Sequence, residues 1–206
     1  MTLTLFFSPG SCSTASHIAL AEAGADYRLV RTDTKAGDQR KPEYLKINPK
    51  GRVPALVTAR GVLTETPAIL AYIAQSFPDA RLAPADPFDF ARMQAFNSYL
   101  CATVHTAHAH KHRGYRWARE EASFRDMTAK VAENETACFR LIESEYLAGP
   151  WVMGEQFTVA DPYLFTLAGW LEGDGVDIGL FPRVQAHYRR MEARPAVRKV
   201  LAEMAA

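Results

Sequence analysis

A cysteine between two serines near the N-terminus is the group in this sequence best suited to sulfur chemistry. Ser11, Cys12 and Ser13 follow Pro9-Gly10 and open a segment with helical character. Backbone amides at a helix N-terminus and nearby hydroxyls stabilise a negatively charged sulfur. We therefore expect this turn to stabilise the thiolate of a bound thiol, and to depress the pKa of Cys12 enough to permit a mixed disulfide. The alternative is a small buried cysteine in a polar turn.

A proline inside a predicted strand marks a second candidate site, at Val53-Pro54. Pro54 lacks an N–H, so it belongs at an edge, where a bend turns the Val53 N–H and C=O toward a peptide-like ligand. Shortly afterwards, Thr66 is expected to cap a helix whose first amides favour a carboxylate, while Glu65 accepts an ammonium group. The alternative for Val53-Pro54 alone is a plain proline turn.

A cluster of histidines lies in one predicted helix. At about 100° per residue, Cys101, His105, His108 and His112 share a face, whereas His110 points away. The stripe is roughly 16 Å long, so one metal ion would reach only a neighbouring pair. We expect no metal site here, and the alternative for His108 and His112 is ordinary solvated helix polarity.

The elements that must position these residues fall into two groups. The first alternates strands at 2–7, 27–30, 53–57 and 62–63 with helices at 13–23 and 67–76, and the second contains only helices, at 88–112, 120–147, 159–172 and 183–203. Three prolines occur in 77–87. We therefore predict an α/β domain over 1–80, a linker over 77–87 and an all-helical domain over 88–206.

Composition excludes several classes of protein. The 206 residues carry 24 Lys+Arg and 23 Asp+Glu, a net charge of +1 that disfavours a nucleic-acid binder. No apolar run is long enough to cross a membrane, and three scattered cysteines fit a reducing cytoplasm better than a disulfide framework. The segment 28–52 is locally basic, with eight Lys/Arg against three Asp/Glu. This excess of positive charge fits either a solvated face or the attraction of an anionic ligand.

The order of these motifs resembles the cytosolic glutathione transferases, and the bacterial beta class in particular. The resemblance rests on Ser8 to His17, on Asn48 to Leu56 followed by Leu63 to Thr66, and on Phe157 to Asp161. It implies a thioredoxin-like β-α-β-α-β-β-α domain followed by a helical bundle, with a cis Val53-Pro54 bond. It also implies a homodimeric enzyme, with glutathione as co-substrate and a small hydrophobic electrophile as acceptor.

The residues assigned on this basis form three sets. Thiolate stabilisation is expected from Cys12, Ser11, Ser13 and His105, because Phe6-Phe7 stand where other classes carry a tyrosine. Glutathione binding is expected from Lys35, Arg52, Val53, Pro54, Glu65, Thr66, Asn97 and Ser98. The second-substrate candidates are Phe6, His108, His112, Tyr115, Trp117 and Trp170.

Two other functions remain open from the sequence. Cys12 fits a glutathione-dependent thiol transferase or disulfide reductase, and the same binding residues fit a non-catalytic glutathione carrier. A ring-opened-diacid isomerase is disfavoured because the first helix lacks the arginines of those relatives. Thr158 and Asp161 form a predicted capping box, which we assign to folding, and we expect His17 to be a core residue paired locally.

Overall fold

The N-terminal half is built on a four-stranded mixed sheet. The computed structural model describes residues 2–147 and 149–205. Its strands are β1 (Leu3–Phe7), β2 (Tyr27–Arg31), β3 (Ala55–Thr58) and β4 (Gly61–Thr64), in the order β2-β1-β3-β4. β1 and β2 are parallel, and the other two pairs are antiparallel. The parallel pair requires a crossover, which the helix after β1 supplies.

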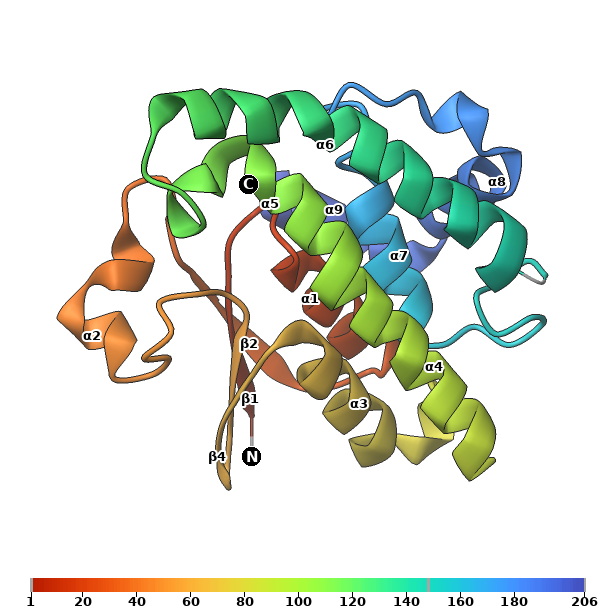
Figure 1. Ribbon diagram of the computed structural model, residues 1–206. Coiled ribbons are helices and arrows are strands. Elements are labelled where there is room, and N and C mark those ends of the chain that lie inside the picture. Colours follow the sequence, from red (N-terminus) through yellow and green to blue (C-terminus); the bar gives the residue numbers. More distant parts are fainter. Residues whose placement is uncertain (1, 148, 206) are drawn as a thin grey trace.

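Three helices accompany this sheet. α1 (Ser13–Glu22) and α3 (Thr66–Ser76) pack on each other on one side of the sheet, whereas the short α2 (Pro42–Leu45) lies on the other (Figure 1). Leu5, Leu20 and Ile69 are fully buried and belong to the same hydrophobic cluster. The predicted β-α-β-α-β-β-α order is thereby confirmed, with element ends shifted by one or two residues.

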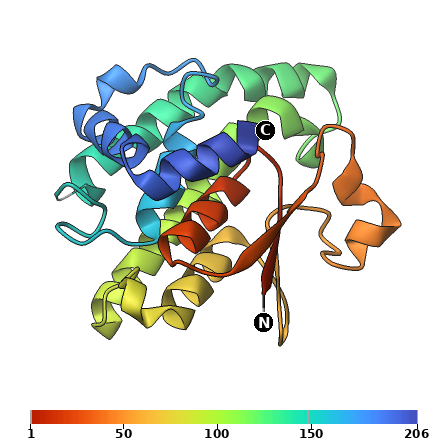
Figure 2. The ribbon, with the colours of Figure 1, turned by 180° about the vertical axis from the view of Figure 1, so that it is seen from behind.

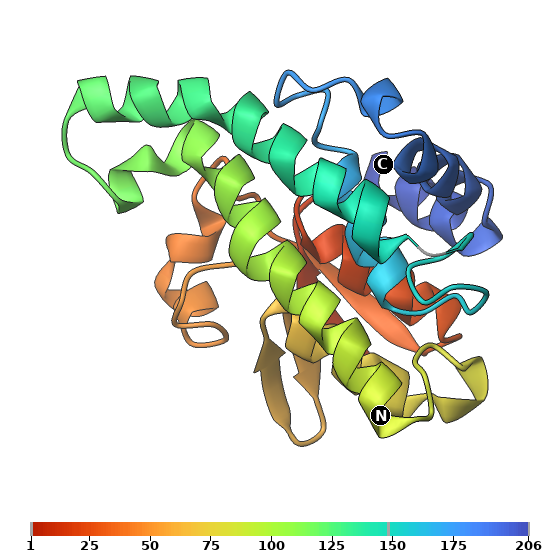
Figure 3. The ribbon, with the colours of Figure 1, turned by 45° about the vertical axis from the view of Figure 1, so that its right-hand side comes forward.

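The C-terminal half is helical. Its helices are α4 (Pro87–Tyr99), α5 (His105–Arg113), α6 (Glu121–Leu141), α7 (Ala160–Ala168), α8 (Pro182–Glu192) and α9 (Pro195–Ala205). A π-helical turn, η3 (Leu100–Val104), joins α4 to α5, so that the two form one long rod beside α6 (Figure 3). A second π-helical turn, η5 (Ile142–Tyr146), extends α6. The helix predicted over 183–203 is divided at Pro195, as expected from the proline there.

Two hydrophobic clusters each contain residues from both halves. α1 packs against both α7 and α9, and Figure 2 shows α9 lying alongside α1. Arg194 holds Glu22 through two hydrogen bonds of 2.5 and 2.7 Å. His17, fully buried in α1, places Nε2 3.0 Å from Glu203 Oε2 of α9, so the expected local partner was wrong. The distant partner arises because α1 is covered by the end of the chain.

The segment between α3 and α4 is not a free tether. The Val159 N–H donates to the Leu82 carbonyl oxygen at 2.9 Å, and Leu82 is buried. Asp86 caps α4 by accepting from the amides of Phe88 and Asp89 at 2.9 and 3.0 Å. The domain boundary at 77–87 remains a prediction. These contacts hold the segment against the helical half, so a linker here would be rigid.

Asp161 joins the start of α7 to two other segments. Its carboxylate accepts from the amides of Val152 and Thr158 at 2.8 and 2.7 Å, and lies 3.0 Å from His187 Nε2. The Thr158 hydroxyl accepts from the Ala160 amide at 3.4 Å. The cap predicted from sequence is present. Because Asp161 is fully buried and also contacts Val152 and His187, it stabilises the packing of distant segments as well as the start of α7.

Candidate functional site

The turn between β1 and α1 is held by a dense set of hydroxyl bonds. Ser11 Oγ lies 2.7 Å from Ser13 Oγ and donates to the Ser8 carbonyl oxygen at 2.8 Å. Ser13 Oγ accepts from the Ser8 amide at 3.1 Å, and Ser13 is fully buried. Ser13 therefore stabilises the turn from within, whereas Ser11 keeps part of its surface exposed.

Cys12 stands at the N-cap of α1, and its thiol faces the Val53 loop. Sγ lies 3.6 Å from the Val53 carbonyl oxygen, to which the thiol donates. Although part of the residue is exposed, desolvation by the surrounding protein raises the pKa of the Cys12 thiol to about 11, and the opposing effects of Thr66 and Arg113 are smaller. The expected depressed pKa was wrong.

Two of the first amides of α1 point elsewhere and do not offset this desolvation. The Ser13 N–H bonds Ser11 Oγ at 3.2 Å, and the Thr14 N–H bonds the Ser11 carbonyl oxygen at 3.0 Å. These donors are used within the turn, so they are not available to the cysteine sulfur. A thiol at a helix start remains neutral when its donors are occupied and water is excluded.

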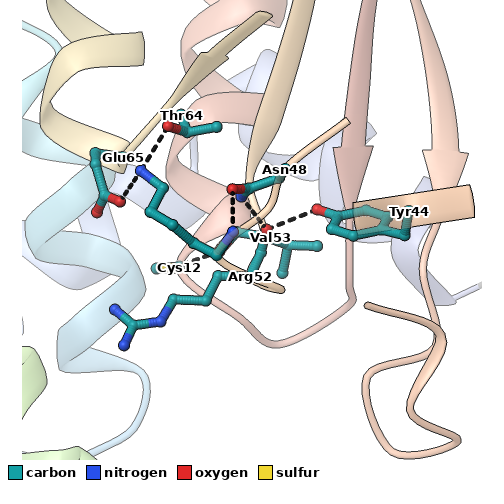
Figure 4. Close-up of polar contacts among 8 residues, drawn as sticks. Cys12, Tyr44, Asn48, Arg52, Val53, Thr64 and Glu65 are labelled. Atoms are coloured by element: carbon teal, nitrogen blue, oxygen red, sulfur yellow. Dashed lines mark hydrogen bonds and ion pairs between the residues drawn. The ribbon is translucent and has the colours of Figure 1, made fainter. Parts of the chain in front are cut away.

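The loop before β3 presents one strand edge of the site. The Val53-Pro54 bond is cis, as the resemblance implied. Tyr44 Oη and Asn48 Nδ2 both donate to the Arg52 carbonyl oxygen at 2.6 Å and fix the loop (Figure 4). Within the described residues the Val53 N–H has no protein acceptor, so it remains free to pair with a ligand.

Glu65 and Thr66 lie at the start of α3, next to this loop. Glu65 occupies the N-cap with a left-handed φ of 72°, and Thr66 is the first helical residue, so the expected Thr66 cap was displaced by one residue. The Thr66 hydroxyl lies near the Cys12 thiol and acts to lower its pKa. Glu65 pairs with the Lys50 ammonium, which also donates to Thr64 Oγ1 at 2.6 Å. The Glu65 carboxylate is thus accessible to an ammonium group.

His105 approaches the site from the helical half. Desolvation, reinforced by the charges of Arg113, His108, Arg52 and Arg116, lowers the pKa of the His105 imidazole to about 4. His105 is therefore neutral near pH 7, and one ring nitrogen carries a proton that it can donate.

Trp170 connects His105 to the Cys12 turn. Its ring lies edge-on to His105 at 5.1 Å and stacks on His108 at 4.3 Å, while its Nε1–H donates to the Gly10 carbonyl oxygen at 3.0 Å. His108 Nδ1 in turn lies 2.6 Å from Asp174 Oδ2. Trp170 therefore ties the turn that carries Cys12 to α5.

The histidine stripe differs from its predicted form. The π-helical turn η3 interrupts the 100° periodicity between Cys101 and His105, so that sequence spacing no longer fixes their relative direction. His110 does lie apart from the others, stacked on Trp117 at 4.2 Å. His112 is exposed. Among the described residues, no group of three or more His, Cys, Asp or Glu is gathered as a metal site.

The remaining candidates are dispersed around this centre. Lys35 is exposed, and only its backbone N–H is bonded, to Asp33 at 2.9 Å. Asn97 is buried in α4 with its amide on Gln94, and Ser98 next to it is exposed. Phe6 is half-buried against Tyr44, with ring centroids 5.8 Å apart. The structure therefore does not gather these four residues around Cys12.

Three functional features escaped the sequence analysis. Arg40, Arg113 and Arg116 come together near the exposed Tyr115, and Arg40 Nη2 donates to Tyr115 Oη at 3.2 Å. Cys101 lies close enough to Tyr163, Glu65 and Arg52 for these residues to influence its pKa, so it borders the site. The Asp174 partner of His108 was also missed. The basic segment 28–52 was the only sequence signal for the arginine group, and it contains one of the three arginines, Arg40.

No helix within the described parts of the chain has the length and apolar character needed to span a membrane.

Comparison with known proteins places the chain in a family. Residues 1–75 match the glutathione S-transferase N-terminal domain and residues 136–190 match the glutathione S-transferase C-terminal domain. Glutathione S-transferase GstA of Escherichia coli O157:H7 is 33% identical over 204 residues, which cover 97% of each chain. A glutathione transferase homologue from Sulfitobacter, solved with bound glutathione, is 49% identical with a TM-score of 0.96 over 98% of each chain. The bacterial beta-class enzyme of Sphingomonas chungbukensis is 34% identical with a TM-score of 0.85 over 98% of each. This chain belongs to the glutathione S-transferase family.

Proposed function

We propose that this protein is an enzyme that binds glutathione, stabilises its thiolate and conjugates glutathione through its sulfur to a hydrophobic electrophile. The observation that supports this most is the convergence of three features at Cys12. Its thiol contacts the Val53 carbonyl oxygen at 3.6 Å and lies near enough to the Thr66 hydroxyl for that group to act on its pKa, so the strand edge, the start of α3 and the cysteine face one space.

The cysteinyl backbone, the γ-glutamyl group and the sulfur of glutathione each have a complementary group in this arrangement. The cysteinyl backbone pairs with Val53 beside the cis Pro54, as an added strand would. The γ-glutamyl carboxylate lies at the first amides of α3 beside Thr66, and its ammonium goes to Glu65 in place of Lys50. The glutathione sulfur is then next to Cys12.

The environment of this sulfur favours the thiolate. Cys12, with a pKa of about 11, stays protonated and is a hydrogen-bond donor rather than a competing nucleophile. Neutral His105 offers a ring N–H, and the Ser11 hydroxyl, which donates to the Ser8 carbonyl oxygen, reaches the sulfur by turning away from that oxygen when glutathione binds. Two units of thiol pKa correspond to about 2.7 kcal/mol, which is within reach of two or three such donors.

The finer assignments are part of the same proposal. Phe6, His108, Tyr115, Trp117 and Trp170 surround the acceptor, with His112 at its margin. Longer-range polar interactions with glutathione come from Lys35, Arg52, Asn97 and Ser98. Ser13 stabilises the turn that carries Cys12. The enzyme works as a cytoplasmic homodimer in the detoxification of small hydrophobic electrophiles. Light scattering on the purified protein would test the dimer, and fractionation of the source cells would test the location.

The raised pKa of Cys12 argues against the thiol-transferase alternative, which needs a reactive cysteine thiolate.

Conjugation of glutathione to chlorodinitrobenzene, measured in the steady state, tests the main proposal. Glu65→Gln should raise the KM for glutathione about tenfold through loss of a charge-assisted bond. The control Glu133→Gln, at an exposed position of α6, should leave the KM for glutathione unchanged. Glutathione binding without conjugation of any acceptor would instead indicate a carrier.

A further inference from the structure

The groups closest to the proposed sulfur position do not hold the proton that a thiol loses when it becomes a thiolate. The Cys12 thiol, with a pKa of about 11, is already protonated near pH 7. The His105 imidazole, with a pKa of about 4, does not retain an added proton at that pH. Arg113 is a permanent cation, and Glu65 is engaged by an ammonium group. The proton therefore leaves for solvent or goes to a basic group beyond these.

A second imidazole lies next to this site. His108 is one helical turn after His105, with ring centroids 6.4 Å apart. Its ring stacks on Trp170 at 4.3 Å, and the Trp170 Nε1–H donates to the Gly10 carbonyl oxygen at 3.0 Å. Gly10 precedes Cys12 by two residues. One aromatic side chain therefore separates His108 from the cysteine turn.

A buried carboxylate fixes the proton of His108. Asp174, in the loop after α7, has a side chain that is 1% exposed, and its Oδ2 lies 2.6 Å from His108 Nδ1. Its other oxygen, Oδ1, accepts from Lys111 Nζ at 3.3 Å. Because a carboxylate only accepts hydrogen bonds, Nδ1 carries the proton of the His108 ring, and Nε2 keeps a free lone pair.

The lone pair on Nε2 is available for a proton. This nitrogen makes no hydrogen bond with the parts of the chain that the structure describes, and the His108 side chain is 24% exposed. A carboxylate behind an imidazole orients the ring and stabilises the imidazolium once it forms. His108 and Asp174 thus have the arrangement of a general base and its orienting acid.

The other charged groups around His108 do not replace Asp174. Glu135 of α6, which lies beside α5 (Figure 3), is buried and responds to both Asp174 and the His108 backbone. Desolvation raises the pKa of its carboxyl to about 8, so it is neutral at pH 7. The positive charges of Arg113 and Arg116 oppose an imidazolium near the end of α5. A thiolate formed at the same time offsets that repulsion, because the transfer creates no net charge.

We propose that His108 accepts the thiol proton of glutathione, with Asp174 as its positioning residue, so that thiolate and imidazolium form together within the site. This inference rests on the proposed function, because it concerns the same sulfur. The S–H bond breaks and its electron pair stays on sulfur. The proton binds one ring nitrogen of His105, while the proton on the other nitrogen passes through one water molecule to His108 Nε2. His105 ends neutral, with an N–H directed at the thiolate.

The proton returns to solvent at the end of the cycle. For a chloroarene acceptor, the thiolate electron pair forms the new C–S bond, and the C–Cl bond breaks with its electron pair leaving as chloride. The His108 imidazolium then loses its proton to water as the product departs. One proton and one chloride leave for each thioether made, so the reaction balances.

Proton release on glutathione binding, measured without any acceptor, tests this proposal. A pH indicator in weakly buffered solution at pH 7 counts the protons released, and ultraviolet absorbance counts the thiolate formed. We expect about 0.2 proton or fewer per thiolate in the unmodified protein, and about one in His108→Gln, because an amide does not take up a proton. Asp174→Asn should give an intermediate value, since the imidazolium then lacks its carboxylate.

Two control variants separate His108 from its neighbours. His110→Gln removes another imidazole of α5, one that stacks on Trp117 at 4.2 Å and lies apart from this cluster. Glu135→Gln removes the other buried acid that responds to Asp174. Both should release as few protons per thiolate as the unmodified protein. Saturable glutathione binding in each variant checks that the site is folded, and counting per thiolate corrects for differences in thiolate yield.

The outcomes separate this proposal from the proposed function. About one proton per thiolate in the unmodified protein, or equal release with and without His108, would overturn the inference and leave glutathione transfer intact. Release in Glu135→Gln but not in His108→Gln would assign the proton to Glu135 and equally overturn it. Saturable glutathione binding with no thiolate in the unmodified protein would contradict the proposed function, and this inference with it.

Discussion

The Trp170 indole donates its Nε1–H to the Gly10 carbonyl oxygen at 3.0 Å, across 160 residues of chain. One end of this contact belongs to the turn that carries Cys12, and the other follows α7. Because the ring also stacks on His108 at 4.3 Å, the position of the cysteine turn depends on the helical half.

Trp170→Phe keeps an aromatic ring but removes this hydrogen bond. We expect kcat for conjugation to fall about fivefold, the effect of one lost hydrogen bond of about 1 kcal/mol, with little change in the KM for glutathione. Asp174→Asn, which loosens His108, should change kcat in the same direction. Steady-state kinetics check both, and a normal kcat in Trp170→Phe would show that the contact does not position the turn.

Asp161→Ala should destabilise the fold rather than alter the chemistry. The substitution leaves two buried amides and His187 without their acceptor, at a cost of about 3 kcal/mol. For a chain of this size that corresponds to a melting temperature lower by roughly 6–12 °C. Calorimetry checks the loss, with exposed Asp126→Ala as the control. Unchanged melting with lost turnover would contradict the structural role.

The Cys12 thiol should react slowly at neutral pH. Its pKa of about 11, raised from 9.0, keeps it protonated, so its alkylation by iodoacetamide should accelerate only toward pH 11. A protein with Cys101→Ala and Cys138→Ala isolates this thiol for mass spectrometry. The raised pKa also means that its stabilising contribution is complete below pH 9 and is lost as the pH rises to 11. Rapid alkylation at pH 7 would revive the thiol-transferase alternative.

Protonation of His105 should oppose folding in mildly acidic solution. Its pKa of about 4 lies below the ordinary 6.5, so the unfolded chain binds more protons between these values. Stability should therefore fall as the pH drops from 6.5 to 4, and less steeply in His105→Asn. Urea unfolding of both proteins across this range measures the difference. Identical pH dependences would show that the imidazole is not desolvated.

Local signals in the sequence were enough to predict the architecture. Pro67 and Pro195 mark helix starts, and Gly10 and Gly24 close the ends of β1 and α1 because both adopt positive φ. Thr158 and Asp161 predicted the α7 cap because both partners lie within one turn of chain. Interactions of this kind are set by neighbours in sequence, which is why they can be read without a structure.

The errors concern groups whose surroundings come from distant segments. The pKa of Cys12 depends on how closely the Val53 loop and Thr66 exclude water, which no local pattern encodes. The partner of His17 lies in α9, and that of His108 lies beyond α7. The π-helical turn η3 has no clear sequence signature either, although it resets the direction of every histidine after it.

The pKa of glutathione bound to this protein tests the central claim most directly. The ultraviolet absorbance of the thiolate, titrated with the protein and corrected for free glutathione, reports it without any acceptor. We predict an inflection about two units below that of free thiol, a smaller shift in His105→Phe and in Ser11→Ala, and tight binding throughout. Saturable glutathione binding with the thiol pKa unchanged would contradict thiolate stabilisation and leave only a glutathione-binding protein.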